Sequence, residues 1–233
     1  MKFPGHSLVR VLGKGRFCTA FESDASNVVK VFQMSDENVA KNEIAMLQRL
    51  AEVSVANVPQ FKASENSMCG SFIALVVSPV GKAVLPIRGG CRTVGKDWAS
   101  IVSTLQHAHS CGIAHRDVKP SNIFMADSGI ILNDWGSSCE MGERIRWVGT
   151  RGYSEEADEN GFHTPSAVCD LKALLRSVYS MMTQEVPPCG GDDSAVRAFW
   201  VERLRESTYW HDCLTAVNCA DYSRLIVCFN CLK

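Results

Sequence analysis

The feature that most restricts how this chain can fold is a pair of charged residues set into apolar surfaces. Residues 28–32 form a β-branched run, and strand alternation places Lys30 on one face with Val28 and Phe32. Glu43 lies within the apolar stripe of a predicted helix. Because buried charges are rarely left unpaired, strand and helix are predicted to pack together through a Lys30–Glu43 ion pair. The alternative is two solvated surface charges.

The order of the predicted elements divides the chain into a β-rich part and an α-rich part. The predicted strands cover residues 8–12, 19–22, 28–32, 72–77, 123–125 and 130–132, and the predicted helices cover 35–50, 96–110, 166–183 and 193–206. Ser35 is expected to cap the first helix. This order predicts an α+β fold in a single domain, with an N-lobe over 1–76, a hinge at 77–81 and a C-lobe over 82–233.

Composition and charge exclude several classes of protein. The 233 residues carry a formal net charge of -1, which gives no reason to expect a nucleic-acid partner. The longest clean apolar run, residues 72–77, is far too short to span a membrane. The first six residues, at 1–6, lack the apolar region of a signal peptide. We therefore expect a soluble protein without a membrane partner.

Cysteine usage points to a reducing compartment. The chain has 11 cysteines at irregular spacings, which we interpret as reduced, mostly buried residues of an intracellular protein. A C-terminal group could in principle bind zinc, and its members are His211, Cys213, Cys219, Cys228 and Cys231. A closed zinc site usually needs two tight ligand pairs, and only Cys228 and Cys231 form one. Helix packing is the favoured interpretation, and zinc is the alternative.

The strongest chemical signal is the run from His115 to Asn122, which reads HRDVKPSN. It resembles the H-R-D-x-x-x-x-N catalytic loop of protein kinases at the right spacing. Asp117 is suited to orient an attacking hydroxyl and accept its proton, and Asn122 to hold a magnesium ion. Lys119 would face the charge of a transferring phosphate. The alternative is an ordinary polar loop between a helix and a hairpin.

A second motif offers a metal ligand. Asp134 is followed by Trp135 and a glycine, directly after the apolar run 130–132. A carboxylate at the end of a buried strand can bind the metal that bridges nucleotide phosphates. Kinases usually have Phe where Trp135 stands, and a bulky aromatic is expected to pack there as well.

A third motif fits phosphate binding. Gly13 and Gly15 form a G-x-G turn between strands, which lets backbone amides approach a phosphate closely. A plain hairpin is the alternative interpretation. Cys18 stands where the kinase pattern has a third glycine, so we expect a stiffer loop there and a looser cover over the nucleotide.

Together these motifs resemble the eukaryotic protein kinase superfamily from residue 8 to about residue 180. The resemblance implies a two-lobed kinase fold that binds ATP and Mg²⁺. It makes Lys30 and Glu43 the pair that holds the α- and β-phosphates. It also places the adenine against the Ser78 carbonyl and the Val80 N–H.

The later motifs resemble the activation segment and the central helix of a kinase. Thr150 lies where kinases have the substrate-binding end of that segment. Asp170 would brace the backbone of the loop that begins with His115 and Arg116. Residues 155–157 replace the usual Ala-Pro-Glu, so the anchor of the segment is an open question. Arg224 is predicted to pair with Glu155 or Glu156.

The activation segment is predicted to work without phosphorylation. Arg116 is the residue that docks a loop phosphate in many kinases. Residues 134–157 contain Glu140 and Glu143, whose carboxylates could partly substitute for a phosphate by pairing with Arg116. The alternative is that Arg116 hydrogen-bonds to backbone carbonyls.

The resemblance implies an enzyme that phosphorylates Ser or Thr in a protein substrate, since Lys119 follows Asp117 as in the Ser/Thr class. A catalytically weak kinase-like binding module is one alternative, favoured by Cys18 and Trp135. A small-molecule phosphotransferase is another. Several motifs also resemble the kinase domains of Crinkler-type effectors of oomycetes and fungi. That narrower resemblance implies action in the cytoplasm or nucleus of a host cell.

Overall fold

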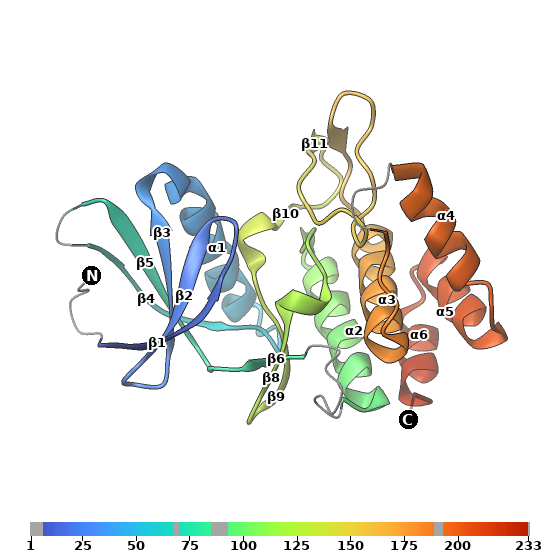
Figure 1. Ribbon diagram of the computed structural model, residues 1–233, viewed down its shortest axis with the longest axis horizontal. Coiled ribbons are helices and arrows are strands. Elements are labelled where there is room, and N and C mark those ends of the chain that lie inside the picture. Colours follow the sequence, from blue (N-terminus) through green and yellow to red (C-terminus); the bar gives the residue numbers. More distant parts are fainter. Residues whose placement is uncertain (1–6, 68–69, 85–92, 189–192, 233) are drawn as a thin grey trace.

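The computed structural model describes residues 7–67, 70–84, 93–188 and 193–232. Residues 1–6, on which the signal-peptide expectation rests, lie outside the described residues. The described chain forms a sheet-rich lobe and a helical lobe, which lie side by side in Figure 1. This arrangement is the α+β, two-lobed fold that the sequence predicts.

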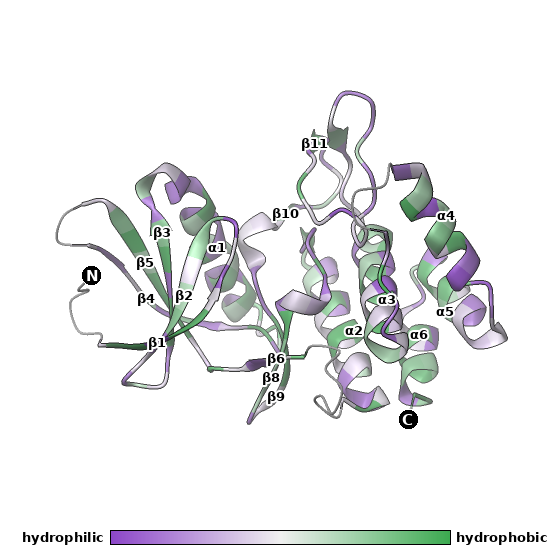
Figure 2. Ribbon diagram, viewed as in Figure 1, coloured by the Kyte–Doolittle hydropathy of each residue, from purple (hydrophilic) through white to green (hydrophobic). Residues whose placement is uncertain are grey.

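The N-terminal lobe is built on a five-stranded antiparallel sheet in the order β1-β2-β3-β5-β4. Its strands are β1 (Leu8–Lys14), β2 (Cys18–Ser23), β3 (Val28–Gln33), β4 (Gln60–Asn66) and β5 (Phe72–Ser78). Hydrophobic residues concentrate on β3 and β5, which are buried in the middle of the sheet (Figure 2). The sequence did not predict β4, because its side chains alternate between exposed and half-buried positions and few of them are apolar.

Helix α1 (Glu37–Glu52) packs against this sheet through Ala40, Leu47 and Leu50. Met34–Asp36 form a separate 3-10 turn before it, so the helix starts later than predicted. Ser35 does not cap α1. Its hydroxyl lies 3.5 Å from the Asp36 carboxylate, and the capping prediction was wrong because Ser35 sits inside the preceding turn.

The C-terminal lobe is mainly helical. Its helices are α2 (Gly95–Ser110), α3 (Ala167–Thr183), α4 (Asp193–Arg203), α5 (Thr208–Asn218) and α6 (Tyr222–Asn230). Its short strands are β6 (Lys82–Ala83), β7 (Ile113–Ala114), β8 (Ile123–Ala126), β9 (Gly129–Leu132), β10 (Cys139–Glu140), β11 (Ile145–Arg146) and β12 (Phe162–His163). The predicted hairpin is confirmed, because β8 and β9 pair with each other. Helix α4 ends earlier than predicted, and the sequence did not predict α5 and α6. Within the described ranges, every helix is too short or too polar to cross a bilayer.

Helices α2 and α6 run antiparallel along each other. At one end, the Gly95 N–H donates to the Leu232 carbonyl at 3.2 Å, and at the other end Tyr222 contacts His109. A Cβ at Gly95 would lie only 2.1 Å from the Phe229 oxygen. Glycine is therefore required where α2 begins, because no side chain fits between the two backbones.

We predict that Gly95→Ala destabilises the fold. The added methyl group forces the backbones of α2 and α6 apart, and overpacking of this kind costs roughly 1–3 kcal/mol. The free energy of unfolding from urea titration measures the effect. Gly13→Ala is the matched control, since a Cβ there meets nothing within 4 Å and its cost should stay within about 0.5 kcal/mol. Equal losses in the two variants would contradict the prediction.

Candidate active site

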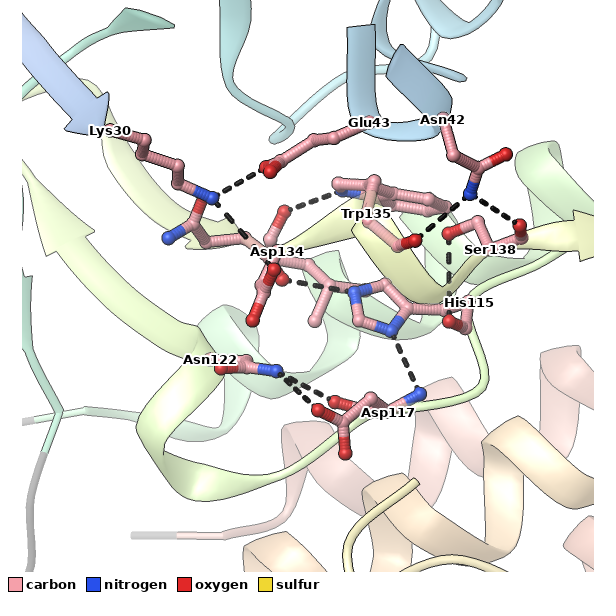
Figure 3. Close-up of polar contacts among 12 residues, drawn as sticks. Lys30, Asn42, Glu43, His115, Asp117, Asn122, Asp134, Trp135 and Ser138 are labelled. Atoms are coloured by element: carbon pink, nitrogen blue, oxygen red, sulfur yellow. Dashed lines mark hydrogen bonds and ion pairs between the residues drawn. The ribbon is translucent and has the colours of Figure 1, made fainter. Parts of the chain in front are cut away.

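The ion pair between Lys30 and Glu43 is present, as predicted from their apolar surroundings. The Lys30 ammonium lies 2.5 Å from a Glu43 carboxylate oxygen and 3.9 Å from the Asp134 carboxylate (Figure 3). Both partners are buried, with 4% and 1% of their surface exposed. Burial alone would lower the pKa of Lys30, but the charges of Glu43 and Asp134 outweigh it and raise this pKa. Lys30 therefore keeps its charge.

Helix α1 also holds the segment that follows Asp134, through two residues that the sequence analysis missed. The Asn42 amide donates to the backbone oxygens of Gly136 and Ser138 at 2.9 and 3.0 Å (Figure 3). Arg49 donates to the Cys111 carbonyl at 2.8 Å and pairs with the Glu140 carboxylate. Asn42 and Arg49 are two turns apart on one helix face, a spacing that could have revealed them.

Trp135 fills a fully buried site in place of the usual Phe. Its ring meets His115 edge-on at a centroid distance of 4.6 Å, and its Nε1–H donates to the Leu132 carbonyl at 2.9 Å. Asp134 takes the left-handed conformation, with φ of 67°. With the aromatic ring turned inward, the Asp134 side chain remains 47% exposed between the lobes. The expectation that a bulky aromatic packs here is confirmed.

The catalytic-loop side chains converge on Asp117. One Asp117 oxygen accepts from the Thr150 hydroxyl at 2.7 Å, and the other accepts from the Lys119 ammonium at 2.7 Å. Lys119 also donates to the Thr150 hydroxyl at 2.8 Å. The Asn122 amide nitrogen donates to the Asp117 backbone oxygen at 2.9 Å. The fold thus brings together residues that are far apart in the sequence.

A buried carboxylate on α3 holds the loop itself. Asp170 accepts the backbone N–H groups of His115 at 2.7 Å and Arg116 at 2.8 Å, as the motif predicts. Burial alone would raise the pKa of Asp170, but hydrogen bonds from His109 and the loop outweigh it, so this pKa is lowered and the group is ionised. His115 is held as a neutral ring because burial lowers its pKa.

Arg116 is occupied by the backbone of the activation segment. Its guanidinium donates to the carbonyls of Ser137 at 3.1 Å and Arg146 at 2.6 Å, and its Nε–H donates to His163 at 3.3 Å. The predicted pairing of Arg116 with Glu140 and Glu143 is wrong: Glu140 binds Arg49 instead, and Glu143 forms no ion pair with any residue that the structure describes. The alternative interpretation, in which Arg116 binds backbone carbonyls, is the correct one.

Arg224 does not reach the end of the activation segment. It is half exposed on α6 and lies 3.3 Å from Asp212, so the predicted pair with Glu155 or Glu156 is wrong. Glu155 binds Arg176 of α3 at 3.0 Å. The physical reason is topological, since α3 passes directly beneath the segment, where Arg176 also donates to the Tyr153 carbonyl at 2.8 Å.

Glu155 has a second cationic partner on α3. The Lys172 ammonium lies 3.4 Å from its carboxylate, one helical turn before Arg176. Glu156 pairs instead with Arg197 of α4. Two neighbouring helices therefore anchor the segment where kinases usually have Ala-Pro-Glu.

The glycine turn between β1 and β2 leaves space beside its backbone. The Gly15 N–H bonds to the Cys18 carbonyl at 2.8 Å. A Cβ at Gly13 would meet nothing within 4 Å, and one at Gly15 would make only an ordinary contact with Cys18. Burial raises the pKa of the Cys18 thiol to about 11, so it stays neutral and packs against the core.

The linker between the lobes starts where β5 ends at Ser78 and reaches β6 at Lys82. A Cβ at Gly81 would lie 3.1 Å from the Phe124 Cβ and 3.3 Å from the Met125 oxygen. The linker therefore lies directly on the β8–β9 hairpin. Its residues Ser78 and Val80 are half-buried.

The C-terminal cysteines take different positions. Cys213 is buried on α5, and Cys228 packs partly against the same core from α6. Cys219 and Cys231 are exposed. Across the described ranges, the structure has no cluster of three or more His, Cys, Asp or Glu residues that could hold a metal ion. Tyr209 also donates to the Cys228 carbonyl at 2.9 Å, which ties α5 to α6.

Comparison with known proteins identifies the family. A family model described as "Protein kinase domain" matches residues 7–208. The chain belongs to the protein kinase family. A solved kinase structure, titled as that of vaccinia related kinase 3, has the same fold, with a TM-score of 0.73 and 12% identity over 96% of this chain and 86% of that one.

Curated kinases show similar sequences over parts of their length. Serine/threonine-protein kinase UCN of Arabidopsis thaliana is 30% identical over 60% of this chain and 40% of its own length. Serine/threonine-protein kinase PknD of Chlamydia felis is 26% identical over 78% of this chain and 24% of its own length. This kinase chain thus matches well under half of each relative. The narrower likeness to effector kinases stays a prediction.

We predict that Arg176, and not Arg224, anchors the activation segment. Arg176→Ala removes the ion pair with Glu155 and the bonds to two backbone carbonyls, so it should lower the free energy of unfolding by roughly 1–3 kcal/mol. Arg224→Ala removes an exposed contact and should change it by less than about 0.5 kcal/mol. Paired thermal and urea melts measure both. A larger loss for Arg224→Ala would contradict the assignment.

Proposed function

We propose that the chain is an ATP-dependent protein kinase that transfers the γ-phosphate to Ser or Thr hydroxyls of protein substrates. The observation that carries the proposal is the set of bonds around Asp117, whose carboxylate meets both Lys119 and Thr150. The Lys30–Glu43 pair is formed at the same time, beside the Asp134 carboxylate. This arrangement of charged side chains supports the proposal, because phosphoryl transfer depends mainly on positioning and charge neutralisation.

The residues between the lobes fit Mg-ATP. Mg²⁺ prefers oxygen ligands and usually combines one or two protein groups with substrate phosphates. Asn122 uses its amide nitrogen on Asp117, and its oxygen points the other way in Figure 3. That oxygen and the Asp134 carboxylate would hold the ion. Bound Mg-ATP supplies the phosphoryl group and the positive charge that neutralises it.

Other parts of the site fit the nucleotide. Gly13 and Gly15 leave room for close approach of the phosphates, with Lys30 charged opposite them. The Ser78 carbonyl and the Val80 N–H are the groups proposed to bind the adenine. Pro79 lies between them, where no donor is needed.

The chain's own residues handle the acceptor hydroxyl. Asp117 orients it and accepts its proton. Lys119, held 2.7 Å from Asp117, faces the charge on the transferring group. Thr150 links this pair to the end of the activation segment and so couples substrate binding to the catalytic loop.

A protein substrate fits better than a small molecule. A cavity of about 680 Å³ lies beside the end of the activation segment, where Arg151 follows Thr150. Its lining combines charged residues of the segment and of α3 and α4 with the apolar Val196, Trp200 and Leu204. These three apolar residues are buried on or just after α4. The cavity offers space for a side chain that neighbours the acceptor residue.

We also propose that activity requires no phosphate on the activation segment. Arg116, the expected phosphate ligand, is already occupied by the Ser137 and Arg146 carbonyls. Asn42, through the Gly136 carbonyl, and Arg49, through Glu140, hold α1 to the same segment. A cellular interior, cytoplasm or nucleus, is the proposed compartment, and the free state of the eight cysteines that the structure describes supports it.

We predict that Asp117→Asn abolishes phosphoryl transfer while nucleotide binding persists. Loss of a general base costs about 10²- to 10⁴-fold in rate. Transfer of label from radioactive ATP to general protein substrates measures the rate, and calorimetry with Mg-ATP measures binding. If wild-type protein transfers no more label than Asp117→Asn, the chain is a kinase-like binding module instead.

We predict that phosphatase treatment leaves the rate unchanged, because no phosphate is needed to hold Arg116. Mass spectrometry must show residues 134–157 to be unmodified in the treated sample. Loss of most activity on dephosphorylation would refute the idea.

Arg49→Gln should lower the rate, since it frees the Cys111 carbonyl and the Glu140 carboxylate.

A further inference from the structure

A chain of three side chains joins the C-terminal helix to the catalytic loop. The Tyr222 hydroxyl of α6 lies 2.7 Å from His109 Nδ1 of α2. On the other side of the ring, His109 Nε2 lies 2.9 Å from the Asp170 carboxylate of α3. Asp170 in turn holds the N–H groups of His115 and Arg116. The hydroxyl of Tyr222 thus stands three hydrogen bonds away from the backbone beside Asp117.

The Asp170 carboxylate decides which group donates in each of these hydrogen bonds. Asp170 is ionised and can only accept, so His109 Nε2 must carry a proton. In a neutral ring, Nδ1 is then the acceptor and needs a donor. Burial and the nearby Asp170 charge raise the pKa of Tyr222 to about 12, so the phenol keeps a proton to donate. In its neutral form, His109 is thereby restricted to the tautomer that carries the proton on Nε2.

We propose that Tyr222 is a positioning residue for phosphoryl transfer, which acts by fixing the orientation and tautomer of His109 against Asp170. The proposal rests on the proposed kinase function for its effect on rate. Its physical core, the bonding of His109, is independent of activity.

The placement of α6 makes this contact firm. The far end of α6 lies against the start of α2, where the Gly95 N–H bonds to the Leu232 carbonyl and no room for a side chain remains. Leu225 and Phe229 of α6 are fully buried. These contacts at both ends of α6 fix its register along α2, which places the Tyr222 hydroxyl against the His109 ring.

Removing the hydroxyl would leave His109 Nδ1 without this donor and the ring free to turn. The Nε2–H would then point at Asp170 only part of the time. Asp170 would keep its two backbone donors but lose the side-chain bond that fixes its angle. The expected result is a catalytic loop that still forms but holds Asp117 less accurately.

The test compares Tyr222→Phe with Tyr209→Phe in the full chain. Tyr209 is also a half-buried tyrosine that bonds to α6, but its hydroxyl donates to the Cys228 carbonyl, away from the catalytic loop. Tyr222→Phe should lower kcat roughly 3- to 10-fold and leave KM for ATP unchanged, as loss of one hydrogen bond predicts. Tyr209→Phe should leave kcat unchanged. Equal effects of the two substitutions on kcat would overturn the proposal.

A second measurement does not need activity. Nitrogen-15 NMR of labelled histidine should show the Nδ1 signal of His109 shifting in Tyr222→Phe and unchanged in Tyr209→Phe. Amide exchange at His115 and Arg116 should become faster in Tyr222→Phe alone. An unchanged Nδ1 signal or unchanged exchange would overturn the positioning role. If wild-type protein transfers no phosphate, the kinase proposal fails, and these two readouts still decide the role of Tyr222.

Discussion

The buried pair of Lys30 and Glu43 is the interaction on which the arrangement of the N-terminal lobe depends. An ammonium group with only 4% of its surface exposed is costly unless a carboxylate accompanies it. Helix α1 can dock on the sheet only with Glu43 turned toward β3, so the pair selects one rotation of the helix. Such a pair adds little net stability, and we infer that its contribution is specificity of orientation. Asn42 and Arg49 of the same helix contact the segment after Asp134, at the Gly136 carbonyl and at Glu140.

In the helical lobe, a second buried carboxylate links different elements, as Glu43 does in the sheet lobe. Asp170 is 2% exposed and collects donors from the catalytic loop and from α2. Each lobe is thus organised around one buried acid whose partners belong to different elements. The two acids act on opposite sides of the same opening, since Glu43 orients Lys30 and Asp170 holds the backbone next to Asp117. Their separate networks hold the residues proposed for phosphoryl transfer from both lobes.

Much of this site could be predicted from the sequence, because its parts carry a signature that is visible without a structure. A charge in an apolar pattern, such as Lys30, demands a partner, and the spacing from Asp117 to Asn122 matches a known catalytic loop. Arg176 is also a charge in an apolar pattern, since its neighbours on α3 are buried. This pattern could have indicated that Arg176 is the partner of Glu155. Arg224 has no such pattern, and only its late position in the sequence favoured it. Tertiary packing decides which helix lies under the activation segment, and the spacing of nearby residues cannot predict it.

The indole of Trp135 has a consequence for the kinds of inhibitor that suit this site. A ligand that requires this ring to swing out must break its bond to the Leu132 carbonyl and its contact with His115. A ligand that binds with the ring in place keeps both contacts. In the proposed nucleotide-binding function, compounds that occupy only the nucleotide space would leave Trp135 where it is, whereas longer ones that extend behind Asp134 would displace it.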